Sequence, residues 1–137
     1  MILDTRTVEQ QLVIRGTEPN RTVWWGELCI CNETDDYQRV GRFAIAAGPL
    51  TGKSIAWIGG GFCVGPRAFA VADCTQTVYE REPSFARFCP DEITFVPGDW
   101  TATMIGTFDL IIWDVGGPIP AALSEHLADS GKVVTID

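Results

Sequence analysis

The sequence predicts an α/β fold in which a parallel β-sheet carries helices on both faces, with a small antiparallel β piece before it. Two observations support this prediction. From residue 54 onward, short apolar runs alternate with helix-like segments that begin at proline, which is typical of strand-helix-strand units. Before residue 48, short β-branched and aromatic runs are separated by turn-forming residues, which is typical of antiparallel hairpins.

The N-terminal part, residues 1–50, is expected to form a hairpin or meander. Its candidate strands are rich in β-branched, aromatic and cysteine residues: 11–15, 22–31 and, more weakly, 42–46. Residues 38–47 can instead be interpreted as a short helix. The turn-rich segment 48–52 ends this part, so we place the boundary with a second domain, residues 51–137, at that segment.

The second part contains five runs that we expect to be parallel strands. They are short and mostly apolar: Ser54–Ile58, 75–79, 93–96, Phe108–Trp113 and 132–136. Helices are expected between them, each opened by proline, which suits the first turn of a helix: 66–72, Pro83–Phe88, and from Pro118 or Pro120 to Leu127. Right-handed crossovers and the usual doubly wound arrangement give a Rossmann-like sheet with strand order 3-2-1-4-5.

The composition fits a globular protein with its own core. The chain has 137 residues, of which 46% are hydrophobic, so burial of apolar side chains can stabilise it without disulfides or metal. Its formal net charge of −8 argues against a nucleic-acid partner and against docking on an anionic membrane. The same acidity suits a small cationic ligand.

Five cysteines and a single histidine give no metal-binding pattern. No two cysteines form a CxxC pair, so we expect no metal and interpret the cysteines as reduced side chains packed as small hydrophobes. The N-terminus has no signal-peptide type of apolar run, and no stretch reaches the roughly 18 apolar residues of a membrane-spanning helix. We therefore expect a cytoplasmic protein.

A glycine turn follows the first predicted strand of the parallel sheet. It contains Gly59, Gly60, Gly61 and Gly65, which allow the backbone to turn tightly and to approach a ligand closely. A dinucleotide fingerprint would place the third glycine at 64, where this chain has valine, so the match to a pyrophosphate site is poor. The turn is expected to cradle an adenosine-containing small molecule, and a structural turn without ligand is the alternative.

Two acidic residues are candidates for contacts with such a ligand. Glu80 lies just past the second strand, 21 residues after Gly59, which is the spacing of an acid that accepts hydrogen bonds from ribose hydroxyls; a solvated charge is the alternative. Asp99 follows the third strand and could accept from the exocyclic amine of adenine, with Trp100 stacking on the base. An ordinary turn with a helix-capping aspartate is the alternative for that pair.

Asp114 is the candidate catalytic residue. It falls at the carboxyl end of the strongest strand, beside the point where the strand order reverses and where open α/β sheets bind their ligands. Its carboxylate could orient an amine or balance a cationic sulfur, and capping of the following helix is the alternative. Asp109, at the start of the same strand, is expected to be structural.

Taken in order, these motifs resemble the spermidine synthase branch of the S-adenosylmethionine-dependent methyltransferase fold. The resemblance rests on four segments: Ile58 to Gly61, Tyr79-Glu80, Gly98-Asp99, and Phe108 to Asp114 with Pro118. It covers residues 51–137 and implies S-adenosylmethionine, or its decarboxylated form, as the cofactor. Three glycines would then cradle the amino-acid or aminopropyl part of the ligand: Gly59, Gly61 and Gly65. Glu80 would be the ribose ligand, Asp99 the adenine-side acid, and Asp114 the aspartate that handles the attacking amine.

The chain also departs from that family's pattern. The glycine turn continues with Phe62, Cys63 and Val64 where the family has an acid and a glycine pair, and one acid is missing after Asp114. The chain ends after the fifth strand, so we expect a C-terminally truncated version of the fold.

The function expected from the resemblance is transfer of an aminopropyl or methyl group, or cleavage of the ligand itself to methylthioadenosine. The alternatives are a non-catalytic module that binds an adenosyl ligand and an NAD-binding half-domain. An exposed edge of the truncated sheet predicts a homo-oligomer. Trp24 and Trp25 of a partner chain could complete the site, although core or interface packing is the role that we favour for these side chains.

Overall fold

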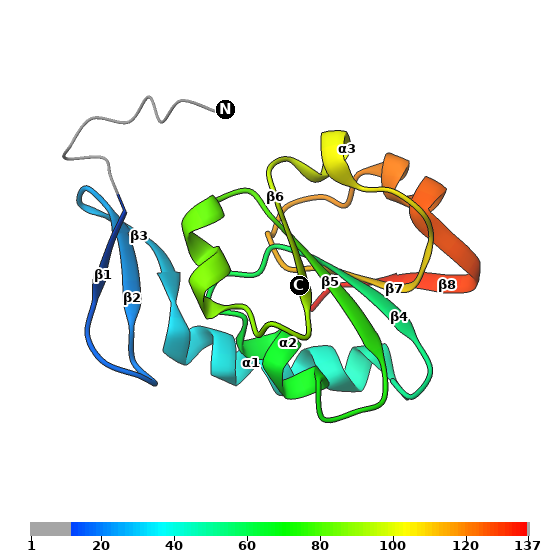
Figure 1. Ribbon diagram of the computed structural model, residues 1–137, viewed down its shortest axis with the longest axis horizontal. Helices are drawn as coiled ribbons and strands as arrows, with labels where there is room; N and C mark the ends of the chain where they lie inside the picture. Colours follow the sequence, from blue (N-terminus) through cyan, green and yellow to red (C-terminus); the bar gives the residue numbers. More distant parts are fainter. Residues whose placement is uncertain (1–11, 137) are drawn as a thin grey trace.

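The computed structural model describes residues 12–136, and these form two sheets (Figure 1). The smaller sheet is antiparallel and has the order β1-β2-β3, built from Leu12–Arg15, Thr22–Trp25 and Leu28–Asn32. The predicted antiparallel piece is therefore confirmed. The predicted strand at 22–31 is in fact two strands, because the chain turns at Gly26, whose φ is +64°. Residue 11 of the first predicted strand lies outside the described residues.

Helix α1 (Glu33–Ala47) follows β3 directly, so the strand predicted at 42–46 is wrong and the alternative helix begins earlier than predicted. Asn32 caps this helix: its side chain accepts hydrogen bonds from Thr34 N at 3.0 Å and Asp35 N at 3.3 Å. The acidic residues of the first turn add a favourable interaction with the helix dipole. The helix ends at Gly48, whose φ of +74° favours glycine.

The larger sheet is parallel and has the order β6-β5-β4-β7-β8. Its strands are β4 (Ser54–Ile58), β5 (Thr75–Glu80), β6 (Thr94–Pro97), β7 (Phe108–Trp113) and β8 (Leu127–Val134). Every neighbouring pair is parallel, as the apolar runs predicted. β8 begins earlier than the predicted 132–136, and it is irregular where it passes Phe108 and Leu110.

Short helices connect the strands of the parallel sheet. They are α2 (Val64–Phe69), the 3₁₀ helices η2 (Pro83–Phe88) and η3 (Ala121–His126), and the single turn α3 (Trp100–Thr103). α2 begins two residues before the predicted 66–72, and η2 has the predicted bounds. None of the helices within residues 12–136 is long and apolar enough to cross a membrane.

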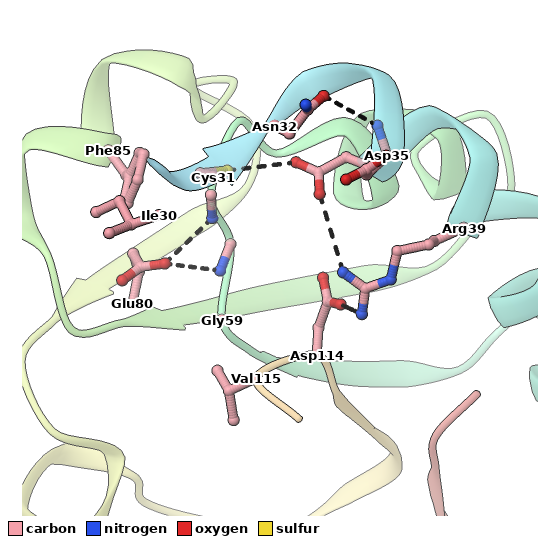
Figure 2. Close-up of a pocket in the computed structure, with 13 residues that line it drawn as sticks. Ile30, Cys31, Asn32, Asp35, Arg39, Gly59, Glu80, Phe85, Asp114 and Val115 are labelled. Carbon is pink, nitrogen blue, oxygen red and sulfur yellow. Dashed lines mark hydrogen bonds and ion pairs between the residues drawn. The ribbon is translucent and has the colours of Figure 1, made fainter. Parts of the chain in front are cut away.

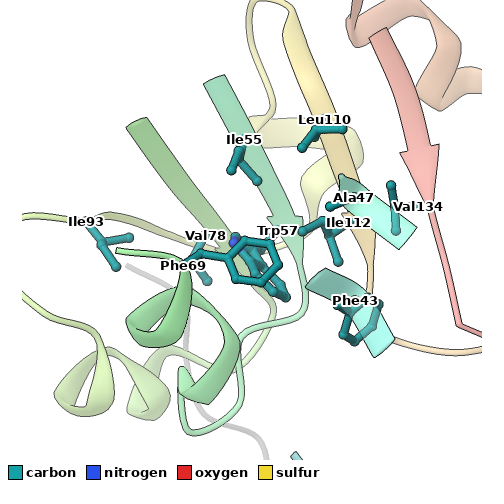
Figure 3. Packing of buried hydrophobic residues seen from close by; sticks show 10 residues of the cluster. All are labelled: Phe43, Ala47, Ile55, Trp57, Phe69, Val78, Ile93, Leu110, Ile112 and Val134. Carbon is teal, nitrogen blue, oxygen red and sulfur yellow. The ribbon is translucent and has the colours of Figure 1, made fainter. Parts of the chain in front are cut away.

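Two apolar layers cover the two faces of the parallel sheet. Alternate residues of β4 divide between them: Trp57 packs beneath α1 and α2, whereas Ile58 packs on the opposite face with Met104 and Leu123. The first layer is shown in Figure 3, where Phe43 and Ala47 of α1 approach Trp57 and Ile112. Side chains from both sides of residue 50 contribute to this layer. The domain boundary predicted near that residue stays a prediction.

The small sheet packs on the glycine turn through a third apolar cluster. Val23 of β2 is buried against Phe62 and Val64, which belong to the turn and to the start of α2. Phe85 of η2 completes the cluster, with its ring centroid 6.3 Å from that of Phe62. The N-terminal strands therefore cover the outer side of the turn that was predicted to bind a ligand.

Candidate functional site

The carboxyl ends of three neighbouring strands bring the main predicted site residues together. In the sheet register Ile58 of β4 pairs with Tyr79 of β5 and with Trp113 of β7. The residues that come next in the sequence are Gly59, Glu80 and Asp114, so these three lie side by side at one edge of the sheet. Two further backbone bonds hold this edge: Gly59 N donates to Tyr79 O at 2.9 Å, and Asp114 N donates to Ile58 O at 3.0 Å.

The glycines of the turn serve two different purposes. Gly59 has a φ of +92°, and a Cβ there would lie 2.7 Å from Val115 Cγ1 and 3.3 Å from the carbonyl oxygen of Asp114. Only glycine fits both the conformation and the space. Gly65 lies instead over the indole of Trp57, where a Cβ added to Gly65 would be 2.4 Å from Trp57 Cη2. Gly65 lines neither of the two large cavities described below.

Glu80 closes the turn from the next strand. Its Oε1 accepts hydrogen bonds from Gly60 N at 3.0 Å and Gly61 N at 3.1 Å, and its Oε2 accepts one from Glu82 N at 2.8 Å. The residue is only 8% exposed, so the alternative of a solvated charge is wrong. Because Oε1 already holds two donors, the remaining acceptor capacity of the carboxylate is on Oε2.

Two cavities meet at Glu80. The first, of about 370 Å³, lies between α1 and the carboxyl edge of the sheet, and the second, of about 410 Å³, lies on the side of α3 and η3. Both are lined by Gly59, Glu80 and Val115. Figure 2, which draws the first cavity, shows Glu80 and Val115 near Gly59. An elongated ligand whose middle rests on Glu80 could therefore extend into both cavities.

The second cavity is mainly apolar and aromatic. Its walls include Ile58, Tyr79, Trp100 and Trp113, and the two indole rings stand nearly perpendicular with centroids 6.4 Å apart. Asp99 also lines it and caps α3, accepting bonds at Oδ1 from the backbone N–H of Thr101 at 2.9 Å and its hydroxyl at 2.8 Å. These bonds hold the pKa of Asp99 below its usual value. The helix-capping alternative is thus correct for Asp99, although its place in the cavity wall also remains compatible with a ligand contact.

The first cavity is polar and contains an ion pair that the sequence did not predict. The guanidinium of Arg39, from α1, contacts the carboxylate of Asp114 (Figure 2). A second guanidinium nitrogen of Arg39 lies 4.0 Å from Asp36 Oδ1. Asp36 Oδ2 accepts a weak bond from the Cys31 thiol, with a sulfur–oxygen distance of 3.6 Å. The capping alternative for Asp114 is wrong, because η3 begins after Pro120.

Burial dominates the electrostatics of these carboxyl groups. It raises the pKa of Asp114 to about 7, although the nearby Arg39 guanidinium opposes the increase. The pKa of Asp36 is raised to about 6 for the same reason. Both groups can therefore exchange a proton near neutral pH, which is the range that suits an acid or base in catalysis.

A second ion-pair network supports the glycine turn from behind. Glu33, fully buried at the start of α1, accepts bonds from Arg21 Nε at 2.9 Å and Nη2 at 2.6 Å, and this holds its pKa below the usual value. Arg67, 4.0 Å from the same carboxylate, donates to the carbonyl oxygens of Phe62 at 3.1 Å and Cys63 at 3.2 Å. The network therefore ties the small sheet, α1 and the turn together.

Two other predictions concern residues away from the cavities. Trp24 donates from its indole nitrogen to the Thr22 hydroxyl at 2.7 Å, Trp25 is partly exposed, and neither lines either cavity. A role for them in a partner's site stays a prediction. Within residues 12–136, no three histidine, cysteine, aspartate or glutamate side chains gather in a way that could hold a metal ion.

No protein-family model matches the sequence, and no curated protein matches it either. Solved structures do match. A SAM-dependent methyltransferase from Thiobacillus denitrificans, in complex with S-adenosyl-L-homocysteine, matches with a TM-score of 0.60 at 13% identity. The match covers 72% of this chain and 47% of that protein. Protein-L-isoaspartate O-methyltransferase has a TM-score of 0.60 at 13% identity. The match covers 92% of this chain and 41% of that protein. This chain has the fold of the S-adenosylmethionine-dependent methyltransferases.

A third match is coclaurine N-methyltransferase, bound to N-methylheliamine and S-adenosyl-homocysteine, with a TM-score of 0.60 at 15% identity. It covers 77% of this chain and 36% of its own length. The chain therefore spans less than half the length of each of these three structures. The methyltransferase part of the sequence resemblance is confirmed at the level of the fold.

Proposed function

We propose that this chain binds S-adenosylmethionine across the two cavities, at the residues that line both of them, and acts as a methyltransferase-like domain. The shared residues are Gly59, Glu80 and Val115. The observation that carries the proposal is Glu80, which closes the glycine turn with Oε1 and lines both the aromatic and the acidic cavity. An acid in this place, at the carboxyl edge of a parallel sheet, is suited to accept a hydrogen bond from a ribose hydroxyl. The fold shared with S-adenosylmethionine-dependent methyltransferases supports the same ligand.

The two cavities suit the two ends of that ligand. The adenine base would enter the second cavity, where Trp100 and Trp113 offer aromatic surface and Asp99 offers a carboxylate to the exocyclic amine. The amino-acid end and the positively charged sulfur would enter the first cavity, whose lining contains the carboxylates of Asp36 and Asp114. Glu80 Oε2 would take the ribose between them.

Asp114 is the residue we assign to the reacting end. When bound, S-adenosylmethionine supplies a methyl carbon that is attacked by a nucleophile while the carbon–sulfur electron pair returns to sulfur. Asp114 would orient the acceptor and take the proton that it releases, and its raised pKa of about 7 suits that role. The Arg39 guanidinium now contacts this carboxylate, so Arg39 has to yield part of that contact when an acceptor arrives.

The finer alternatives from the sequence concern the same site. Decarboxylated S-adenosylmethionine, as used by the spermidine synthase branch, lacks the ligand's carboxylate and would avoid repulsion from the acidic lining of the first cavity. Aminopropyl transfer and self-cleavage would both release methylthioadenosine. A non-catalytic module that binds the adenosyl ligand is the second candidate, and the observation that favours it is the Arg39 contact on Asp114. An NAD-binding half-domain is the less favoured alternative, since Val64 stands where a dinucleotide turn has glycine.

Self-association belongs to the same proposal. Within the described chain β6 and β8 are the edges of the parallel sheet, and a second copy could pair with one of them. Light scattering of the purified chain tests this, and a monomeric mass would contradict it. The absence of nucleic-acid partners and a location in the cytoplasm also remain proposals.

The activity is tested by incubating the chain with S-adenosylmethionine, with and without amine acceptors, and by separating the products. Methyl transfer predicts S-adenosyl-homocysteine, whereas cleavage or aminopropyl transfer predicts methylthioadenosine. Asp114→Asn should abolish either product, and Asp91→Asn, an exposed control that lines neither cavity, should not. Tight binding without turnover, unaltered by Asp114→Asn, would favour the non-catalytic module.

A further inference from the structure

The position of Arg39 is the starting point of this inference. It lies one helical turn after Asp36 on α1 and reaches across the first cavity to Asp114 at the end of β7. Its guanidinium carbon also stands 5.5 Å from the centre of the Phe43 ring. The Arg39 side chain is 33% exposed, compared with 18% and 19% for Asp36 and Asp114, so the guanidinium is the most accessible of the three groups.

The charge balance of this cavity favours a cation. Among its lining residues, four carry carboxylates and one carries a guanidinium: Asp35, Asp36, Glu80, Asp114 and Arg39. Burial already raises the pKa of Asp36 and Asp114, which means that the uncompensated negative charge is unfavourable there. A positive charge placed beside them is stabilised, and Arg39 is the positive charge that the chain itself supplies.

We propose that Arg39 is a specificity-determining residue, whose guanidinium occupies the place where Asp114 would otherwise stabilise the positive sulfur of a bound ligand. The inference rests on the proposed function and goes beyond it, because it concerns the charge of the ligand that the site prefers. Two cations compete for one carboxylate and repel each other at short range. Arg39 therefore reduces the preference of the site for a sulfonium over the neutral thioether that remains after transfer.

A pair of ligands isolates this effect. S-adenosylmethionine and S-adenosyl-homocysteine share adenine, ribose, ammonium and carboxylate, and they differ in one methyl group and in the charge on sulfur. The ratio of their dissociation constants therefore reports the charge preference at the sulfur. At pH 8 the Asp36 and Asp114 carboxylates of the wild-type chain are ionised, since their pKa values are about 6 and about 7. Arg39 lowers both pKa values, so its loss raises them, and isothermal titration of both ligands is therefore done at pH 8 and again at pH 9.

Four chains are compared: wild type, Arg39→Gln, Arg39→Lys, and Arg42→Gln as a control from an exposed position of the same helix that lines neither cavity. Removal of the guanidinium should shift the ratio about tenfold toward S-adenosylmethionine, as expected when one charge at short range is removed from a partly screened site. The control should leave the ratio unchanged. Arg39→Lys keeps the charge and should stay close to wild type.

The outcomes separate the inference from the proposed function. If both ligands bind and Arg39→Gln leaves their ratio unchanged, the inference is wrong and the proposed function stands. Equal weakening of both ligands would also overturn it, because Arg39 would then bind the carboxylate that the two ligands share. If neither ligand binds the wild-type chain, both proposals fail. Should Arg39→Gln not fold, Asp114→Asn provides the second test, and a ratio that does not move toward the thioether would contradict the inference.

Discussion

The carboxylate of Glu80 accepts a hydrogen bond from the backbone N–H of Gly60 at 3.0 Å, which links the end of β5 to the turn after β4. The same oxygen accepts from Gly61, so one buried side chain satisfies two backbone donors of the turn. This relationship fixes the shape of the turn and leaves Oε2, which accepts one bond from Glu82 N, as the carboxylate oxygen with capacity for a further donor. Stability and ligand binding should therefore depend on the same residue.

Glu80→Ala tests that dependence. The substitution leaves the N–H groups of Gly60 and Gly61 without their acceptor in a buried place, which should cost about 2–3 kcal/mol of unfolding free energy. It should also raise the dissociation constant of S-adenosyl-homocysteine about tenfold, as expected for loss of a hydrogen-bond acceptor in the site. Urea unfolding and isothermal titration measure the two effects. Glu92→Ala, at an exposed position, is the control, and a Glu80 variant as stable as that control would refute this role.

Gly65 and Gly41 form a matched pair of glycine substitutions. Gly65→Ala would place a Cβ 2.4 Å from Trp57 Cη2, and overpacking of this kind should destabilise the chain by about 1–3 kcal/mol. Gly41 lies within α1 with nothing within 4 Å of a Cβ, so Gly41→Ala should stabilise it by about 0.5–1 kcal/mol. Thermal unfolding of the two variants should give shifts of opposite sign. A neutral Gly65→Ala would show that the contact with Trp57 does not constrain this position.

The raised pKa of Asp114 should make the stability of the chain depend on pH. Its pKa is raised to about 7 in the folded chain, so between its unfolded value near 4 and pH 7 the folded state binds more protons than the unfolded state. Its contribution to stability is therefore present at low pH and is lost as pH rises through 7. From pH 5 to pH 8 wild type should lose about 2 kcal/mol more unfolding free energy than Asp114→Asn. Urea titrations of both chains at the two pH values measure this, and parallel curves would contradict it.

The lowered pKa of Glu33 should make stability depend on pH in the opposite direction. Arg21 holds its pKa below the usual value, so the stability that this pair contributes is present above about pH 4 and is lost as pH falls through the folded pKa. Glu33→Gln leaves Arg21 without its charged partner and should cost about 3 kcal/mol at neutral pH. Glu27→Gln, at an exposed position, provides the comparison in the same denaturation experiment. Equal stability of the two variants would show that the buried pair contributes nothing.

The parallel sheet could be predicted from the sequence because its central strands are buried on both faces. Their apolar runs, Ser54–Ile58 and Phe108–Trp113, are the strands β4 and β7 with the same bounds. Helix α1 was not predicted over its full length. Asn32 and the acids that follow it favour a turn and a helix start equally, and only burial of Phe43 and Ala47 against the sheet decides between them.

In the site too, local sequence patterns located some residues, whereas contacts between distant segments could not be predicted. Glu80 and Asp114 were placed correctly at the carboxyl edge, because strand ends and sequence spacing locate them. Arg39 was missed, because its partner Asp114 is 75 residues away and the contact requires α1 to lie over the end of β7. Gly65 was grouped with the ligand turn on its spacing and on the family resemblance, whereas its immediate neighbour is the Trp57 ring. Contacts between distant segments, such as these two, leave no local pattern in a single sequence.

The most direct test of the central claim is a crystal structure of the chain with S-adenosyl-homocysteine. Adenine should lie beside Trp100 in the second cavity, a ribose hydroxyl should bond to Glu80 Oε2, and the amino-acid end should point toward Asp114 in the first cavity. Electron density for the ligand at any other place, or its absence at saturating concentration, would contradict the claim.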